Sequence, residues 1–149
     1  MRGKRVVLIA VGVVLFLVFS AGLARFLTTD NLEREEDVAL IEDEAKGDAA
    51  GMIAKLSGCR ERPACVTSVK QNAANPELHR PGSVKILSLS SATANSPTGA
   101  TGKTRLAWTV LGKPPVVQCV EVKRTGNAVT GTKVALLSLS KPIANEGDC

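Results

Sequence analysis

The sequence predicts an α+β protein with an N-terminal transmembrane helix, then about three helices packed on one face of a four-stranded antiparallel sheet. Three observations support this fold class. Residues 6–24 form an apolar run without a charge. Beyond that run, apolar residues recur every three or four positions as far as about residue 73, which is the period of an amphipathic helix. From residue 83 they alternate with polar residues between short polar connections, as in half-buried antiparallel strands.

The apolar run Val6–Ala24 is long enough to cross a membrane as a helix. At a rise of about 1.5 Å per residue it spans ~28 Å, close to the ~30 Å hydrocarbon thickness of a bilayer. A helix pairs all its own backbone groups, as lipid requires. We therefore expect membrane lipid to be a partner through Val6–Ala24, with the anchor helix extending over residues 6–27.

Basic residues determine the expected orientation of this anchor. The tail at residues 1–5 carries Arg2, Lys4 and Arg5, whereas Arg25 alone follows the run before an acidic stretch. Because the flank richer in Lys and Arg stays in the cytoplasm, residues 28–149 are expected outside it as one domain. Small residues before Arg25 also permit a signal peptide cleaved near Ala24, which would release a secreted protein. We favour the uncleaved anchor.

Charge is divided unevenly along the exported part. Nine acids fall between positions 30 and 48, whereas from 49 to 145 thirteen Lys or Arg residues face only Glu61, Glu77 and Glu121. A basic face for an anionic polymer, lipid headgroups or an acidic envelope protein is one interpretation. The interpretation we favour is a solvated surface whose basic residues partly face the acidic helix of the same molecule. Near the membrane, that helix would act as a spacer repelled by anionic lipid.

Aromatic residues are scarce beyond the anchor. All three Phe residues lie in or beside the apolar run, there is no Tyr, and Trp108 is the one aromatic residue of the exported domain. Nucleic-acid modules that stack bases need several exposed aromatic side chains. We therefore expect no nucleic-acid partner and no aromatic sugar-binding platform.

All four cysteines, Cys59, Cys65, Cys119 and Cys149, lie beyond the apolar run. An even number on the exported side predicts disulfides formed in an oxidising compartment. No C-x-x-C pair occurs and His79 is the only histidine, so we expect no metal site and no cofactor. Four cysteines allow three pairings, among which the sequence does not decide; we favour Cys59–Cys65 and Cys119–Cys149.

Three helices are expected within the domain, two of them in residues 28–57. Asp30 with Glu33 is a capping pair that would open a helix over 31–46. Gly47-Asp48 would close that helix and cap the next, over 48–57. Pro63 suits the first position of a third helix over 63–73.

The sheet is expected within residues 83–140, with a tail at 141–149. Its strands would be Ser83–Ser91, Thr104–Leu111, Val116–Arg124 and Ala128–Ser140, with a tight hairpin turn at Gly126-Asn127. In the second strand, Leu106, Trp108 and Val110 share one face.

The run IEDEAKGDAAGMIAKL resembles the opening of nuclear-transport-factor-like domains, a cone-shaped α+β superfamily. Those domains begin with a helix, a Gly-Asp break and a short second helix. The resemblance implies a curved sheet with helices on one face, as in the periplasmic domains of membrane-anchored type IV secretion scaffold proteins. The superfamily also includes isomerases with Asp, His and Tyr inside the cone.

Candidate catalytic residues are few. The chain lacks Tyr, and no nucleophile, metal or nucleotide motif occurs. A pocket near Trp108, lined by Cys119 and Glu121, is the one candidate site. The interpretation we favour for Glu121 is nevertheless a surface carboxylate. We therefore expect a protein that is not an enzyme: a membrane-anchored, extracytoplasmic partner-binding or scaffold domain. The alternative is a small-ligand-binding cone or a degenerate enzyme. The composition, rich in Ala, Val and Arg, suggests a bacterial source.

Overall fold

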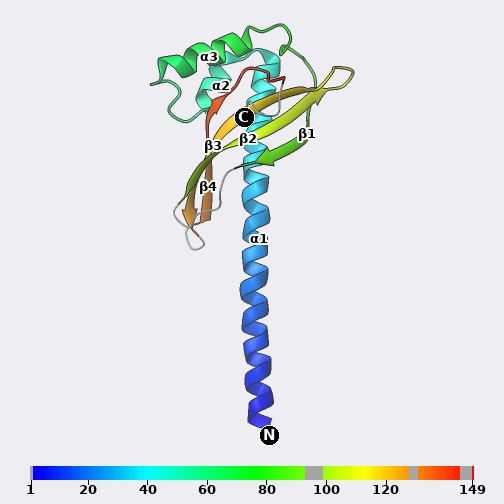
Figure 1. Cartoon of the computed structure of the whole chain (residues 1–149), viewed down its shortest axis with the longest axis vertical. Coiled ribbons are helices and arrows are strands. Elements are labelled where there is room, and N and C mark those ends of the chain that lie inside the picture. The colour runs from blue at the N-terminus through cyan, green and yellow to red at the C-terminus, as the bar shows by residue number, and fades with distance from the viewer. Residues whose placement is uncertain (1, 93–98, 128–130, 145–148) are drawn as a thin grey trace.

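The computed structural model describes residues 2–92, 99–127, 131–144 and 149, and it confirms the α+β class (Figure 1). Three helices are followed by four strands. The helices are α1 (Arg2–Lys46), α2 (Ala49–Lys55) and α3 (Pro63–Ala73); the strands are β1 (Val84–Ser91), β2 (Ala100–Val110), β3 (Val116–Asn127) and β4 (Gly131–Leu139).

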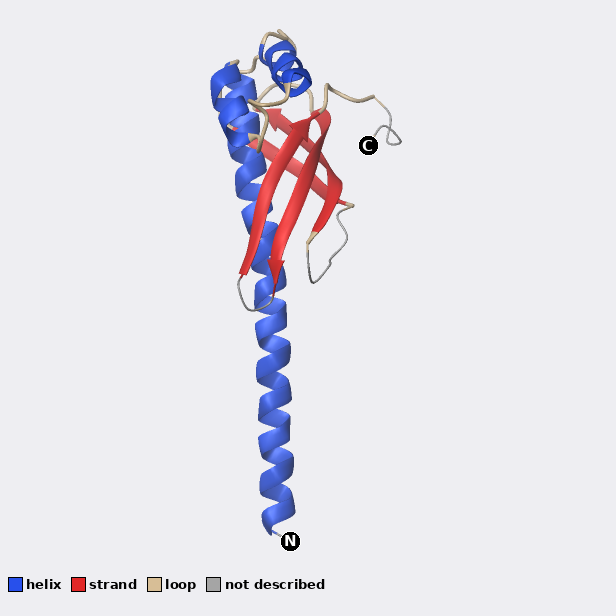
Figure 2. Cartoon of the chain, turned by 90° about the vertical axis from the view of Figure 1, so that its left-hand side faces the viewer, coloured by secondary structure: helices blue, strands red, loops and turns tan. Residues whose placement is uncertain are grey.

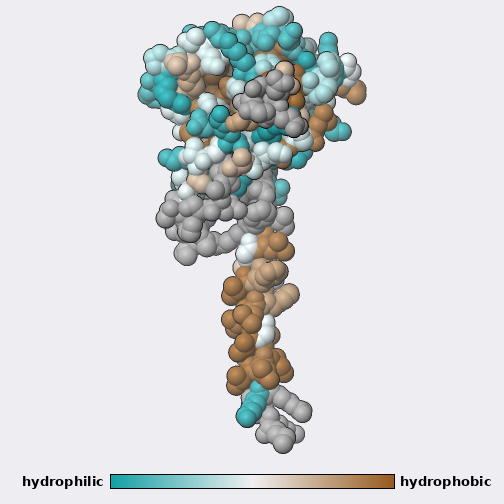
Figure 3. Space-filling view, in the orientation of Figure 1, coloured by the Kyte–Doolittle hydropathy of each residue, from teal (hydrophilic) through white to brown (hydrophobic). Residues whose placement is uncertain are grey.

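Helix α1 is one continuous helix that joins the apolar run to the domain. Its first half projects alone, and none of the span Val7–Ala24 is buried (Figure 3). Its second half lies along one face of the sheet (Figure 2). The expected separate helix opening at Asp30 is therefore wrong. No Gly or Pro lies between Gly22 and Gly47 to interrupt the helix.

The four strands form one antiparallel sheet in the order β1-β2-β3-β4. Gly126 pairs with Thr132 and Asn127 with Gly131, so β3 continues through the expected hairpin turn. That prediction of the turn position is wrong, because the connection falls at residues 128–130, outside the described residues. β4 is extended on its outer side by one bridge from Leu56, whereas β1 forms the opposite edge.

The core lies between the second half of α1 and the sheet. Leu40 and Ile41 of α1 and Trp108 of β2 are completely buried there. Helices α2 and α3 do not lie flat on the sheet; they cover its end farthest from the apolar half of α1 (Figures 1 and 2). The predicted break is confirmed, because Gly47 has φ +73° and Asp48 accepts a hydrogen bond from the Gly51 N–H. The predicted third helix, 63–73, is also confirmed.

Both favoured disulfides are present in the structure. Cys59–Cys65 closes the short loop before α3, with 5.4 Å between its Cα atoms. Cys119–Cys149 connects β3 to the C-terminus, with 5.7 Å between its Cα atoms. The C-terminal residue lies on the face of the sheet opposite α1 (Figure 2).

Candidate functional site

Three carboxylates of α1 are buried against the sheet. Glu33, Asp37 and Glu44 are each 0% exposed. Their spacings of four and seven residues place them on one face of the helix, the face that also carries Leu40 and Ile41. The acidic stretch was expected to face basic residues and to act as a spacer near the membrane, so this interior row is the main feature that the sequence reasoning missed.

Glu33 is neutralised by a basic residue from the sheet. Arg124 of β3 donates from Nε to Glu33 Oε2 at 2.9 Å and from Nη2 to the same oxygen at 2.5 Å. The Thr104 hydroxyl of β2 donates to Glu33 Oε1. Both carboxylate oxygens are thus satisfied, as a buried charge requires. The contact fixes α1 across β2 and β3.

Glu44 belongs to a second buried polar chain. Trp108 Nε1 donates to Gln118 Oε1 at 2.7 Å, and Gln118 Nε2 donates to Glu44 Oε1 at 2.9 Å. Burial raises the pKa of Glu44 to about 7, although the hydrogen bond from Gln118 acts in the opposite direction. This chain connects α1 to the middle of the sheet.

Asp37 lies between Glu33 and Glu44 along α1, but its carboxyl group differs from theirs in its hydrogen bonding. Neither of its carboxylate oxygens has a hydrogen-bond partner among the described residues. Burial, with the nearby charges of Glu33 and Glu36, raises the pKa of Asp37 to about 8. Asp37 therefore carries a proton at neutral pH.

A raised carboxyl pKa is a frequent property of catalytic acids, so Asp37 is a candidate for chemistry. Its surroundings do not favour this. Leu40, Leu106 and Trp108 are each 0% exposed, and they fill the space between α1 and the sheet. A dissolved substrate would have to displace the helix to reach Asp37. The buried carboxylates therefore serve the packing of α1 in this structure.

The structure does not bring the three predicted pocket residues to one surface. Trp108 faces α1 and is completely buried. Cys119 and Glu121 have the opposite parity to Gln118 and Val120, which are buried on the α1 side, so they lie on the other face of the sheet. Cys119 forms its disulfide there, and Glu121 Oε2 accepts a hydrogen bond from Ser138 at 3.0 Å.

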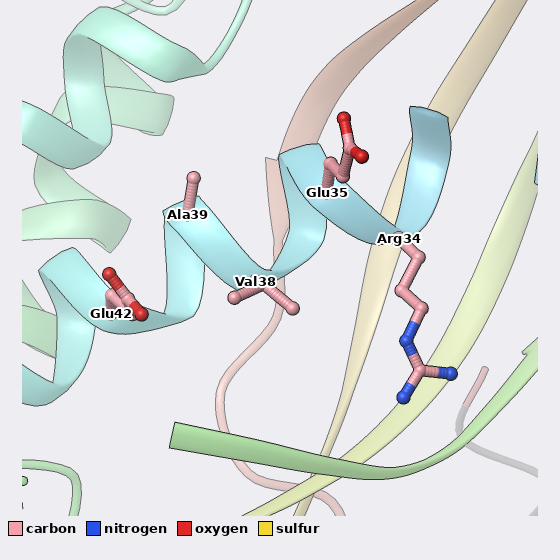
Figure 4. A pocket seen from close by; sticks show the side chains of 5 residues that line it. All are labelled: Arg34, Glu35, Val38, Ala39 and Glu42. Carbon is pink, nitrogen blue, oxygen red and sulfur yellow. The ribbon is translucent and has the colours of Figure 1, made fainter. Parts of the chain in front are cut away.

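The outer side of α1 carries a shallow groove (Figure 4). Its volume is about 280 Å³, and its lining residues are Arg34, Glu35, Val38, Ala39 and Glu42. Arg34 extends toward β1 in Figure 4, where its Nη2 donates to the Ile86 carbonyl at 3.5 Å. Next to Ile86, Leu87 is 51% exposed at a bulge in this edge strand. The groove and the β1 edge together present apolar side chains with charges on either side.

Among the described residues, the acidic and basic parts of the chain pair in two places. Arg124 contacts Glu33 in the interior, and Lys55 of α2 forms an ion pair with Asp43 of α1. The interpretation that basic residues partly face the acidic helix is therefore confirmed for these two.

Comparison with models of protein families, with curated proteins and with solved structures finds no match to this chain.

Proposed function

We propose that this protein is a single-pass, membrane-anchored extracytoplasmic domain that binds a partner or acts as a scaffold and is not an enzyme. The observation that carries the proposal is the continuity of α1. One helix has a fully exposed apolar half and a second half whose buried face forms part of the domain core. A membrane explains why a water-soluble fold would retain such an exposed apolar half.

Charge and cysteine chemistry support the orientation with the N-terminus in the cytoplasm. Arg2, Lys4 and Arg5 precede the span, and both disulfides follow it. Cleavage near Ala24 is the competing arrangement. The helix continues without a break from Ala24 to Lys46, which suits an anchor that remains attached.

The packed interior favours binding at the surface over binding inside the cone. The groove of α1, beside the unpaired edge of β1, is the surface we assign to the partner. An edge strand with an adjacent apolar groove offers both backbone hydrogen bonds and side-chain contacts to an extended segment. Membership of the nuclear-transport-factor-like superfamily remains a proposal, supported by the order of helices and strands.

Asp37 favours the alternative, a small-ligand-binding domain or degenerate enzyme. Its two unpartnered oxygens would suit a ligand that accepts a hydrogen bond from the protonated oxygen and donates one to the other. That alternative requires α1 to separate from the sheet, which would break the Glu33–Arg124 pair.

A photoreactive amino acid at Glu35, in the groove, tests the binding surface in intact cells. The matched control replaces Lys70, which is also exposed but lies on α3. We expect a discrete crosslinked species from position 35 and none from position 70. Adducts from Lys70 alone, or identical adducts from both, would contradict the assignment of the groove.

A further inference from the structure

The end of the sheet nearest the apolar half of α1 carries three exposed lysines. β2 begins there, β3 ends there and β4 begins there (Figures 1 and 2). Lys103, Lys123 and Lys133 come from these three strands in turn, and each is exposed. We call these three residues the basic end.

The height of the basic end above the apolar span follows from helix and strand geometry. Glu33 is nine residues beyond Ala24, which is ~13 Å along the helix axis. Glu33 contacts Thr104, and Thr104 pairs with Val120 of β3. From Val120 the strand runs toward the apolar half of α1, and Arg124, which follows Lys123, contacts Glu33 directly. The backbone of Lys123 therefore lies between the level of Glu33 and that of Ala24, within ~13 Å of the end of the apolar span.

Lys133 lies lower still on the same reasoning. It pairs with Thr125, two residues beyond Lys123 along β3. A lysine side chain extends several ångströms beyond its backbone and carries its charge at the tip. Charges interact within a screening length of ~8 Å at physiological salt, so these ammonium groups are within range of lipid headgroups.

Acids of the described strands balance only part of this charge. Glu121 lies opposite Lys103 in the register, and it is the one acid that pairs in register with a residue of the basic end. The positive charge of Arg124 is neutralised by its ion pair with Glu33. Among the described residues none of the three lysines forms an ion pair, and in the sequence of α1 Arg25 and Asp30 balance each other.

We propose that the basic end binds the phosphate groups of anionic phospholipids in the membrane that holds α1, a proposal that rests on the anchored arrangement above. Lysine suits this partner because its ammonium is a flexible point charge that adapts to mobile headgroups. Each lysine near an anionic surface contributes about 1 kcal/mol, equivalent to about a fivefold change in local binding. Three acids of the expected acidic spacer, Glu33, Asp37 and Glu44, are inside the fold and present no charge to the lipid.

Lysine footprinting of the full chain in vesicles tests this proposal. The protein is reconstituted in phosphatidylcholine vesicles, or in an equal mixture with phosphatidylglycerol, and is briefly acetylated with a membrane-permeant reagent. Mass spectrometry compares the basic end with exposed Lys70 and Lys113 in the same molecules. We expect acetylation of the basic end, relative to these two, to fall about threefold or more on anionic vesicles. The relative acetylation should recover in about 1 M salt, where the screening length is shorter.

Equal relative acetylation in the two kinds of vesicle would overturn the proposal. Flotation of the same samples separates this outcome from failure of the anchor, because an unanchored chain floats with neither vesicle. Protection in detergent with inorganic phosphate alone would indicate a soluble phosphate ligand and would also overturn the proposal.

A variant pair adds a second measurement. The variant K103Q/K123Q/K133Q should lose any rise in thermal stability that anionic vesicles give, whereas K70Q/K113Q should keep it. An identical response of both variants would contradict the proposal.

Discussion

Arg124 donates two hydrogen bonds to Glu33, a residue 91 positions earlier in the chain. Glu33 lies on α1 just beyond the apolar half, and Arg124 lies near the end of β3 closest to that half. The pair therefore holds the sheet beside α1 just beyond its apolar half. The position of the basic end relative to α1 depends on this contact.

Removing one member of the pair should destabilise the domain strongly. Glu33→Ala leaves the Arg124 charge buried, which typically costs about 3–5 kcal/mol. Denaturant unfolding of the full chain in detergent measures the free energy of unfolding. Glu35→Ala, an exposed residue of the same helix, is the matched control and should change it by less than about 0.5 kcal/mol. Similar values for the two variants would show that the pair does not secure α1.

Asp37 should make the domain less stable as the pH rises. Its folded-state pKa of about 8 exceeds the ordinary value of 3.8, so the folded state holds its proton more tightly than the unfolded state does. Its contribution is therefore greatest below the ordinary pKa and is lost progressively as the pH rises through about 8. At pH 7 ionisation of the unfolded chain costs on the order of a few kcal/mol.

Replacing Asp37 by Asn tests this dependence of stability on pH. The variant should be more stable than the wild type above pH 7 and should show a flatter dependence of unfolding free energy on pH. Glu36→Gln, at the neighbouring exposed position, is the control and should leave most of the slope in place. A wild-type slope that Asp37→Asn does not change would contradict the assignment.

The two disulfides should differ in their effects on stability. Cys119–Cys149 closes a loop with a sequence separation of 30, and Cys59–Cys65 closes one of six. On the chain-entropy model the longer loop contributes ~3.7 kcal/mol and the shorter ~2.2 kcal/mol. Replacing each pair by Ser and measuring thermal unfolding should show the greater loss for Cys119–Cys149; the reverse order would contradict the model for this chain.

A break in α1 between its apolar half and the domain should change the position of the domain without unfolding it. Thr28→Pro removes a backbone hydrogen bond and strains the helix at a cost of about 3 kcal/mol, while the buried face from Glu33 onward is unchanged. We expect both disulfides to form as before. The protection of Lys123 on anionic vesicles should fall, because the helix no longer fixes its height. Thr28→Ala is the control and should behave as the wild type.

Local signals in the sequence predicted several elements correctly. Pro63 begins α3, Gly47-Asp48 separates α1 from α2, and both favoured cysteine pairings are present. The first two depend on the local propensities of Pro, Gly and Asp, whereas the cysteine pairing was one of three that the sequence left open. Alternation likewise identified four strands, because the sheet has one face against α1 and one toward solvent.

The burial of these three carboxylates could not be predicted from local signals in the same way. Glu33 and Arg124 are separated by 91 residues, and Glu44 and Gln118 by 74. Nothing local distinguishes an acid that will meet a buried partner from one that faces water. The available signal was the spacing of Glu33, Asp37 and Glu44 in line with Leu40 and Ile41, which places them on the packed face. The predicted position of the β3–β4 connection was wrong for a related reason. Gly126 and Asn127 pair with residues of β4, so the turn does not lie at these two residues.

The central claim is that α1 crosses a membrane with the N-terminus inside and the folded domain outside. Lys4 is the only lysine before the apolar span, and Lys70, Lys113 and Lys141 are exposed beyond it. A membrane-impermeant amine reagent applied to intact spheroplasts should modify those three and should reach Lys4 only after lysis. Modification of Lys4 in intact spheroplasts, with the other three protected until lysis, would contradict the account.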